Sequence, residues 1–153
     1  MEAEHDFVKY PELRPGEEMD TFYFQSPHKQ ITEDFRATVM KVHDGDTVTL
    51  RWNDRNFDFP MRLSIINAPE LNEEGGHEAR DYLESKILFS EVDVKINPDN
   101  RVEKWGRLLG QVVFNGIDMG EELMNLGMAV PFERRNEDKL PNLDKELAVS
   151  KWL

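Results

Sequence analysis

Three short clusters of polar residues carry side chains that can do chemistry together. The first is Asp44-Gly45-Asp46-Thr47, and its carboxylates are the kind of oxygen ligand that hard divalent cations prefer. Arg62 and Arg107 can each meet two oxygens of a phosphate, because the guanidinium is a planar fork of donors. Glu70 follows a proline, so a stiff backbone aims its carboxylate, which can deprotonate or orient a water molecule.

Each cluster also has an ordinary structural interpretation, which the residues alone leave open. Asp-Gly-Asp often does no more than form a turn, and Arg62 lies in a mostly apolar stretch where a structural salt bridge is common. Glu70 is followed by further glutamates that are typical of a solvated loop. Trp105, between Lys104 and Gly106, can pack in a core or stack on a sugar or base.

The elements that would position these clusters are short strands separated by turn residues. Alternating, β-branched runs at 37–42 and 47–52 surround an Asp-Gly pair, which predicts a hairpin. A third strand is expected from Phe59 to Ile66, ending before Pro69. The remaining expected elements are a helix at 78–88, strands at 92–96 and 106–114, a short helix at 120–127 closed by Gly127, and a terminal helix at 143–153.

This order predicts an α+β fold that is mainly β, a five-stranded OB-fold barrel with about three helices. The barrel domain is expected to span residues 36–153. Residues 1–35 are expected to form an acidic N-terminal arm, with nine acidic and three basic side chains, a net charge of −6. Several aromatic residues in the arm predict that it is partly ordered, against the barrel or in self-association.

Composition excludes some classes of site, and the net charge of the chain is at odds with binding to polyanions. The chain has no cysteine, which excludes disulfides, zinc–thiolate sites and thiol nucleophiles. Its net charge of −12 is unusual for a protein that binds polyanions, although net charge does not decide what a local site does. No apolar run approaches the roughly 20 residues that span a bilayer. Because no secretory signal is recognisable either, we expect no membrane partner and a cytoplasmic or otherwise intracellular location.

The three clusters, in this order, resemble the staphylococcal nuclease-like (thermonuclease) family from about residue 36 to about residue 130. The resemblance implies an OB-fold endonuclease that hydrolyses DNA or RNA with little sequence preference, depends on a divalent cation and leaves 3′-phosphates. The acidic charge also keeps a second hypothesis open. Some domains of this kind have lost hydrolysis and serve as modules that bind nucleic acid or protein.

The resemblance also implies a role for each cluster. Asp46, the side chain of Asn67 and the carbonyl of Ala68 would hold the cation, with Ca²⁺ expected first, and Asp44 would act on it through a water molecule. The best-known family member has aspartate at the position of Asn67. The amide still offers an oxygen but removes one charge, so weaker binding or another divalent ion is expected.

The remaining implied roles concern the substrate. Glu70 would activate or place the attacking water, while Arg62 and Arg107 would stabilise charge on the scissile phosphate. Lys104 and Trp105 would line the nucleotide pocket, with Trp105 where the family has a tyrosine. Nucleic acid is therefore the expected partner.

Overall fold

The computed structural model describes residues 6, 8–13 and 28–132. Ten elements follow one another along the described chain. They are β1 (Phe35–Asp44), β2 (Thr47–Arg51), β3 (Phe59–Leu63), β4 (Ile66–Asn67), α2 (Gly76–Ile87), β5 (Glu91–Lys95), β6 (Leu108–Phe114), β7 (Ile117–Asp118), α3 (Met119–Asn125) and β8 (Val130–Pro131). The terminal helix expected at 143–153 lies outside the described residues.

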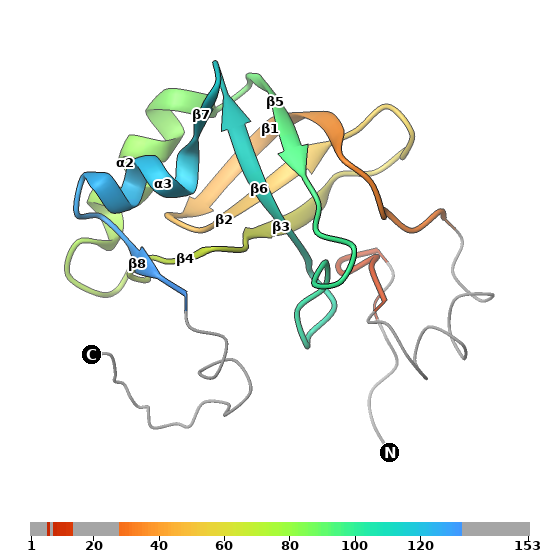
Figure 1. The fold of residues 1–153 in the computed structure, drawn as a ribbon, viewed down its shortest axis with the longest axis horizontal. Coiled ribbons are helices and arrows are strands. Elements are labelled where there is room, and N and C mark those ends of the chain that lie inside the picture. Colours follow the sequence, from red (N-terminus) through yellow and green to blue (C-terminus); the bar gives the residue numbers. More distant parts are fainter. Residues whose placement is uncertain (1–5, 7, 14–27, 133–153) are drawn as a thin grey trace.

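Five strands close into a barrel (Figure 1). The sheet order is β3-β2-β1-β5-β6-β7, and a parallel pairing between β3 and β6 joins the two sides of the sheet. Short β4 and β8 form a separate antiparallel pair. The predicted fold, a mainly β barrel of the OB type, is confirmed. Of the three expected helices, two lie in the part of the chain that is described.

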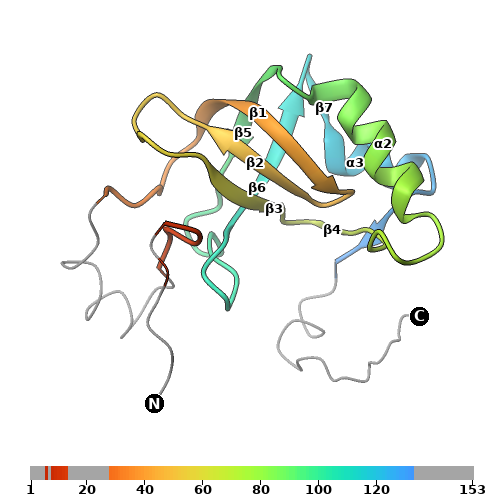
Figure 2. The ribbon, with the colours of Figure 1, turned by 180° about the vertical axis from the view of Figure 1, so that it is seen from behind.

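Apolar side chains fill the barrel because they alternate along the strands and therefore share one face. In β3, Phe59, Met61 and Leu63 point inward, and the residues between them are half-buried. Helix α2 covers one end of the barrel with Ala79, Leu83 and Ile87, which lie four residues apart and form one buried stripe. Figure 2 shows α2 and α3 together on that side. In the described part of the chain, no helix is long and apolar enough to span a bilayer.

The predicted hairpin at Asp44-Gly45 is confirmed as the β1–β2 turn, and close packing explains the glycine there. An Asp-Gly hairpin commonly requires a positive φ at glycine, but Gly45 is not among the glycines with positive φ in the described chain. A Cβ on Gly45 would instead lie 2.7 Å from the Cβ of Ala68 and 2.9 Å from the Cβ of Ala79. Gly45 therefore allows the turn to press against α2 and against the residues after β4.

Two expected boundaries are also corrected. The third strand ends at Leu63 rather than Ile66, because the chain turns at Ser64 and Ile65 and resumes as β4. The amide of Ser64 donates to the carbonyl of Gly110 in β6. The strand expected from Gly106 begins at Leu108, since residues 103–106 form a tight turn. Gly106 has φ 99° there, a conformation that favours glycine.

Candidate functional site

The centre of the site is Asp46, at the turn between β1 and β2. Only 7% of this residue is exposed, and its carboxylate accepts hydrogen bonds from the Ala68 amide at 3.0 Å and the Thr47 hydroxyl at 3.1 Å. The Asp46 amide in turn donates to Asp44 Oδ1 at 3.0 Å. The register between β1 and β2 shifts between Val42 and Asp44, an irregularity of the kind that re-aims side chains beside functional sites.

Arg62 joins Asp46 to Asn67. Its Nη2 lies 3.4 Å from Asp46 Oδ2 and 3.0 Å from Asn67 Oδ1, and Nη1 donates to the carbonyl of Leu63 at 3.2 Å. The ring of Phe132 lies 5.0 Å from the guanidinium carbon. Strand register explains the meeting, because Thr47 pairs directly with Arg62 across β2 and β3. Asp46, Arg62, Asn67 and Ala68 therefore form one cluster.

Arg107 reaches the same turn from the loop before β6, the strand that closes the barrel by pairing with β3. It makes a two-point ion pair with Glu103, from Nε at 2.9 Å and from Nη2 at 2.8 Å, and its Nη1 lies 3.4 Å from the Thr47 hydroxyl. The parallel pairing of Met61 with Leu108 places Arg107, one residue earlier, beside the strand that carries Arg62. Two guanidinium groups thus approach the adjacent residues Asp46 and Thr47.

The carboxylates of the turn differ in their affinity for protons. Burial alone would raise the pKa of Asp46, but the positive charge of Arg62 and hydrogen bonds from Asp44, Ala68 and Thr47 outweigh it, so that pKa is lowered. Burial and the neighbouring Asp46 raise the pKa of Asp44 to about 7. Below that pH the pair carries one negative charge, on Asp46.

The charge of Arg107 is secured by its partners. Burial lowers the pKa of its guanidinium, but the hydrogen bonds and charge of Glu103 raise that pKa overall. Asp46 and Tyr10 contribute in the same direction. Arg107 is therefore a fixed positive charge that is already paired with a protein carboxylate.

The structure does not bring Glu70 into contact with this cluster. Glu70 lies exposed on the loop after β4, where its amide donates to Glu73 Oε1 at 2.8 Å. Its own carboxylate makes no hydrogen bond or ion pair within the described residues. The turn at Glu70 is tight, since the Glu73 amide donates back to the Glu70 carbonyl at 2.9 Å.

Trp105 lies on the surface, so the interpretation of it as a core residue is wrong. It is 67% exposed at the tip of the loop between β5 and β6. The ammonium of Lys104 lies 5.4 Å from the centre of its ring. Both residues are on the loop that positions Arg107.

Three neighbours of the site were not identified from the sequence. Glu103 orients Arg107, and its spacing of four residues was a usable signal across the Gly106 turn. Thr47 was visible only as part of the Asp-Gly-Asp-Thr motif, without a role of its own. No local signal identifies Phe132, which reaches Arg62 because its amide bonds to the Ile65 carbonyl at 2.9 Å beside the β4–β8 pair.

The donor set of the turn fits a hard cation. Within the described ranges, no three histidine or acidic side chains cluster as a metal site would require, so carboxylates alone would not complete one. The available oxygens are the Asp46 carboxylate, the Asn67 amide oxygen and the Ala68 carbonyl. The first two already face one positively charged group, Arg62 Nη2. Such a mixture of carboxylate, amide and carbonyl oxygens is typical of calcium sites.

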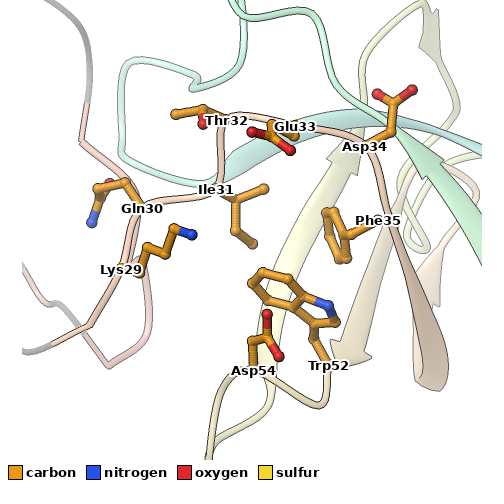
Figure 3. A pocket seen from close by; sticks show the side chains of 9 residues that line it. All are labelled: Lys29, Gln30, Ile31, Thr32, Glu33, Asp34, Phe35, Trp52 and Asp54. Carbon is orange, nitrogen blue, oxygen red and sulfur yellow. The ribbon is translucent and has the colours of Figure 1, made fainter.

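A separate cavity at the other end of the barrel has the wrong charge for a phosphate. It has a volume of about 130 Å³ and lies between the segment before β1 and the loop after β2 (Figure 3). Phe35 and Trp52 form its apolar side, with their ring centres 4.8 Å apart. Three of its lining residues are acidic, and the only basic one is a lysine. This cavity is therefore a poor match for a polyanion.

Comparison with known proteins identifies the family of this chain. A family model described as staphylococcal nuclease homologue matches residues 60–151. A micrococcal nuclease from Shigella flexneri is 35% identical over 79 residues, which are 52% of this chain and 42% of that protein. The matched region thus spans less than half of that relative's length. Asp44–Thr47 precede the part matched by the family model. Strand pairing joins Thr47 to Arg62 within that part, and a side-chain contact joins Thr47 to Arg107. The chain belongs to the staphylococcal nuclease homologue family.

Proposed function

We propose that this protein is a metal-dependent endonuclease that hydrolyses phosphodiester bonds of DNA, RNA or both, with little sequence preference. One observation carries the proposal. Arg62 of β3 and Arg107 of the loop before β6 approach the adjacent residues Asp46 and Thr47, at 3.4 Å in each case. Guanidinium groups that converge on a carboxylate turn suit a reaction in which charge develops on phosphate oxygens. The similarity to a micrococcal nuclease supports the same chemistry.

The proposed cation site uses Asp46, Asn67 and the carbonyl of Ala68, with Asp44 acting through water. A bound divalent cation would supply Lewis-acid polarisation of the phosphate and a more acidic water molecule. Ca²⁺ is the first candidate because the donors are hard oxygens. The lowered pKa of Asp46 supports the proposal, since a ligand must be ionised to hold a cation.

The arginines have alternative partners in the absence of substrate. Arg62 is held by Asp46 and Asn67, and Arg107 is held by Glu103. When a phosphate enters, each guanidinium can exchange a protein oxygen for a phosphate oxygen and keep its charge paired. The exchange at Arg62 also frees the oxygens of Asp46 and Asn67 for a cation, so binding of the two ligands is expected to be mutually favourable.

Glu70 is proposed to take a proton from the attacking water or to hold that water in line. Its carboxylate is unpaired within the described residues and lies two residues from Ala68, on the loop beside the turn. If the water attacks opposite the 5′-oxygen, that oxygen leaves and the product retains a 3′-phosphate. Lys104 and Trp105 are proposed to hold the adjacent nucleotide. The activity is assigned to residues 36–153, with residues 1–35 as an appended arm.

The test uses purified protein, plasmid DNA and single-stranded RNA with a panel of divalent cations. Cleavage is expected with Ca²⁺, and a chelator should abolish it. Glu70→Gln is expected to lower kcat by about 10²–10⁴-fold, the usual contribution of a general base. Because Glu70 is exposed, this substitution should leave the thermal unfolding of the protein unchanged. Glu74→Gln, an exposed glutamate of the same loop, is the matched control and should retain activity. Full activity of Glu70→Gln would contradict the mechanism.

A second candidate function is a binding module without hydrolysis. Two observations favour it: both arginines are already neutralised within the protein, and Asn67 lacks the charge of an aspartate. Calcium titration by thermal unfolding separates the candidates. An enzyme should be stabilised by Ca²⁺, and further by Ca²⁺ with a nucleoside bisphosphate, because ligands that bind the native state stabilise it. A binding module should respond to neither or to nucleic acid alone.

A further inference from the structure

A buried carboxylate fixes part of the N-terminal segment, residues 8–13, to the barrel. Glu12 is 0% exposed and forms ion pairs with Arg55, from the β2–β3 loop, and with Arg101, from the β5–β6 loop, the latter at 2.9 Å. Its Oε1 also accepts the amide of Ile31 at 3.0 Å. A buried carboxylate with two guanidinium partners is held in one place, because leaving any of the three charges unpaired is costly.

The backbone around Glu12 is anchored as well. The Leu13 amide donates to Gln30 Oε1 at 2.8 Å, and Gln30 Nε2 donates to the Pro11 carbonyl at the same distance. Arg101 Nη2 donates to the carbonyl of Leu13 at 3.2 Å. Residues 11–13 are therefore packed into the barrel, and they fix the position of the residues that precede them.

This anchoring places Lys9 and Tyr10 beside the loop that carries Arg107. Both views show residues 8–13 next to the loop between β5 and β6 (Figures 1 and 2). Arg101, the anchor, lies on that loop together with Trp105 and Arg107. Tyr10 immediately precedes the anchored residues, and its phenol is close enough to help raise the pKa of Arg107.

The N-terminal segment and the β5–β6 loop carry the same pair of side-chain types, a lysine over an aromatic ring. The ammonium of Lys9 lies 5.2 Å from the centre of the Tyr10 ring, and that of Lys104 lies 5.4 Å from the Trp105 ring. Lys9 and Trp105 are exposed, and Tyr10 is half-buried. Aromatic rings on which bases stack, combined with cations that neutralise phosphates, are the features by which proteins bind single-stranded nucleic acid.

We propose that Lys9 and Tyr10 form, with Lys104 and Trp105, a binding surface for the nucleotides of a single strand next to the phosphate held at Arg107. The inference rests on the proposed function and extends it to a segment outside the barrel. A single strand is the fitting ligand because its bases are free to stack on exposed rings, whereas the bases of a duplex are not. The N-terminal segment would then contribute to substrate affinity rather than to the chemical step.

The experiment measures binding without cleavage. The full chain carries Glu70→Gln, and a labelled oligodeoxythymidylate is titrated with Ca²⁺ present while fluorescence anisotropy is followed. Adding Lys9→Ala and Tyr10→Ala together is expected to weaken binding by about 10-fold or more, through one lost stacking contact and one lost phosphate contact. Tyr10→Phe keeps the ring and should bind normally. Because Tyr10 is half-buried, thermal unfolding is measured for every variant, and affinities are compared at a temperature at which each variant is folded.

The matched control is Lys86→Ala on α2, where a lysine ammonium also lies over a tyrosine ring, 5.6 Å from the centre of Tyr82. Lys86 is in the last turn of α2, whereas Gly45 packs on Ala79 in the first half of the helix. If the Lys9/Tyr10 variant binds the oligonucleotide as tightly as the Lys86→Ala control, this inference is overturned, whereas the proposed function is not contradicted. If the Glu70→Gln chain binds no oligonucleotide, the proposed function fails, and this inference fails with it.

Discussion

At residue 67 the chain carries an amide where the best-known family member has a carboxylate. Asn67 Oδ1 accepts a hydrogen bond from Arg62 Nη2 at 3.0 Å, so the side chain is already oriented toward the oxygen of Asp46 that faces the same nitrogen. The consequence concerns charge rather than geometry. With Asn67, the proposed cation would meet one full negative charge from its direct ligands.

Asn67→Asp is therefore expected to tighten calcium binding. The added charge also strengthens the ion pair with Arg62, but a divalent cation gains more than a monovalent guanidinium from the same carboxylate. We expect the Kd for Ca²⁺ to fall about 10-fold, which corresponds to about 1.4 kcal/mol. Isothermal titration calorimetry measures it directly. Asn53→Asp, an exposed position in the loop after β2, adds the same charge far from the site and should leave the Kd unchanged. Weaker binding by Asn67→Asp would remove residue 67 from the ligand set.

At the scale of elements, the contact between the β1–β2 turn and α2 fixes where Asp46 points. Gly45 leaves no room for a methyl group, since a Cβ would approach Ala68 and Ala79 to 2.7 and 2.9 Å. Neither neighbour has a flexible side chain that can move aside. The turn must therefore move if the glycine is replaced, and the carboxylate that follows it must move as well.

We expect Gly45→Ala to lower the free energy of unfolding by about 1–3 kcal/mol, the usual cost of overpacking, and to reduce activity more than stability alone explains. Urea unfolding and the rate of DNA cleavage measure the two effects. Ala79→Gly removes one of the two obstructing methyl groups. In the Gly45→Ala background it should recover part of the stability, although in the wild-type helix it costs about 1 kcal/mol. Equal effects of Ala79→Gly in both backgrounds would rule out the clash.

The N-terminal segment is a second element whose attachment can be tested. Glu12→Ala would leave Arg55 and Arg101 buried without their common carboxylate. Breaking a buried ion pair in this way costs about 3–5 kcal/mol. We expect a loss of that order in urea unfolding, whereas Glu33→Ala, at an exposed position, should change stability by less than about 0.5 kcal/mol. A cost below about 1 kcal/mol for Glu12→Ala would mean that the segment does not depend on this ion pair.

At the scale of the whole molecule, the proposed site gathers basic side chains in an acidic protein. The net charge is −12, and the proposal places Lys9, Arg62, Lys104 and Arg107 in one binding region. Long-range repulsion slows the approach of a polyanion, and short-range contacts hold it once it has arrived. The two effects respond differently to salt, which makes salt dependence a measurement of the balance between them.

We expect binding of single-stranded DNA by the Glu70→Gln chain to weaken only modestly with salt. Release of counterions at about four phosphate contacts gives a slope of log K against log salt of roughly −3, and screening of the overall repulsion makes the slope shallower than that. Anisotropy titrations between about 50 and 300 mM NaCl measure it. Lys9→Ala should reduce the slope by less than about one unit. A slope steeper than roughly −4 would require basic contacts beyond these four residues.

Much of the architecture could be predicted from the sequence because local patterns specify it. Alternating apolar residues identified the strands, and the stripe of Ala79, Leu83 and Ile87 identified α2. The errors occurred where tertiary contacts override local pattern. The third strand ends at Leu63 although its apolar pattern continues to Ile66, because the chain turns at Ser64 and Ile65. The strand expected from Gly106 begins at Leu108, because residues 103–106 form a turn. Burial of Glu12 within an acidic segment could not be foreseen, because its two partners come from distant loops.

The sequence by itself determined which residue types are available, the order of the strands and the family to which they belong, since these depend on local periodicity and on short motifs. Only the tertiary structure decided that the motifs meet. The register of Thr47 with Arg62 and of Met61 with Leu108 brings Arg62 and Arg107 to the turn at Asp46. Registers of this kind depend on how the whole barrel closes around its core, and a shift of one residue would turn each side chain to the opposite face.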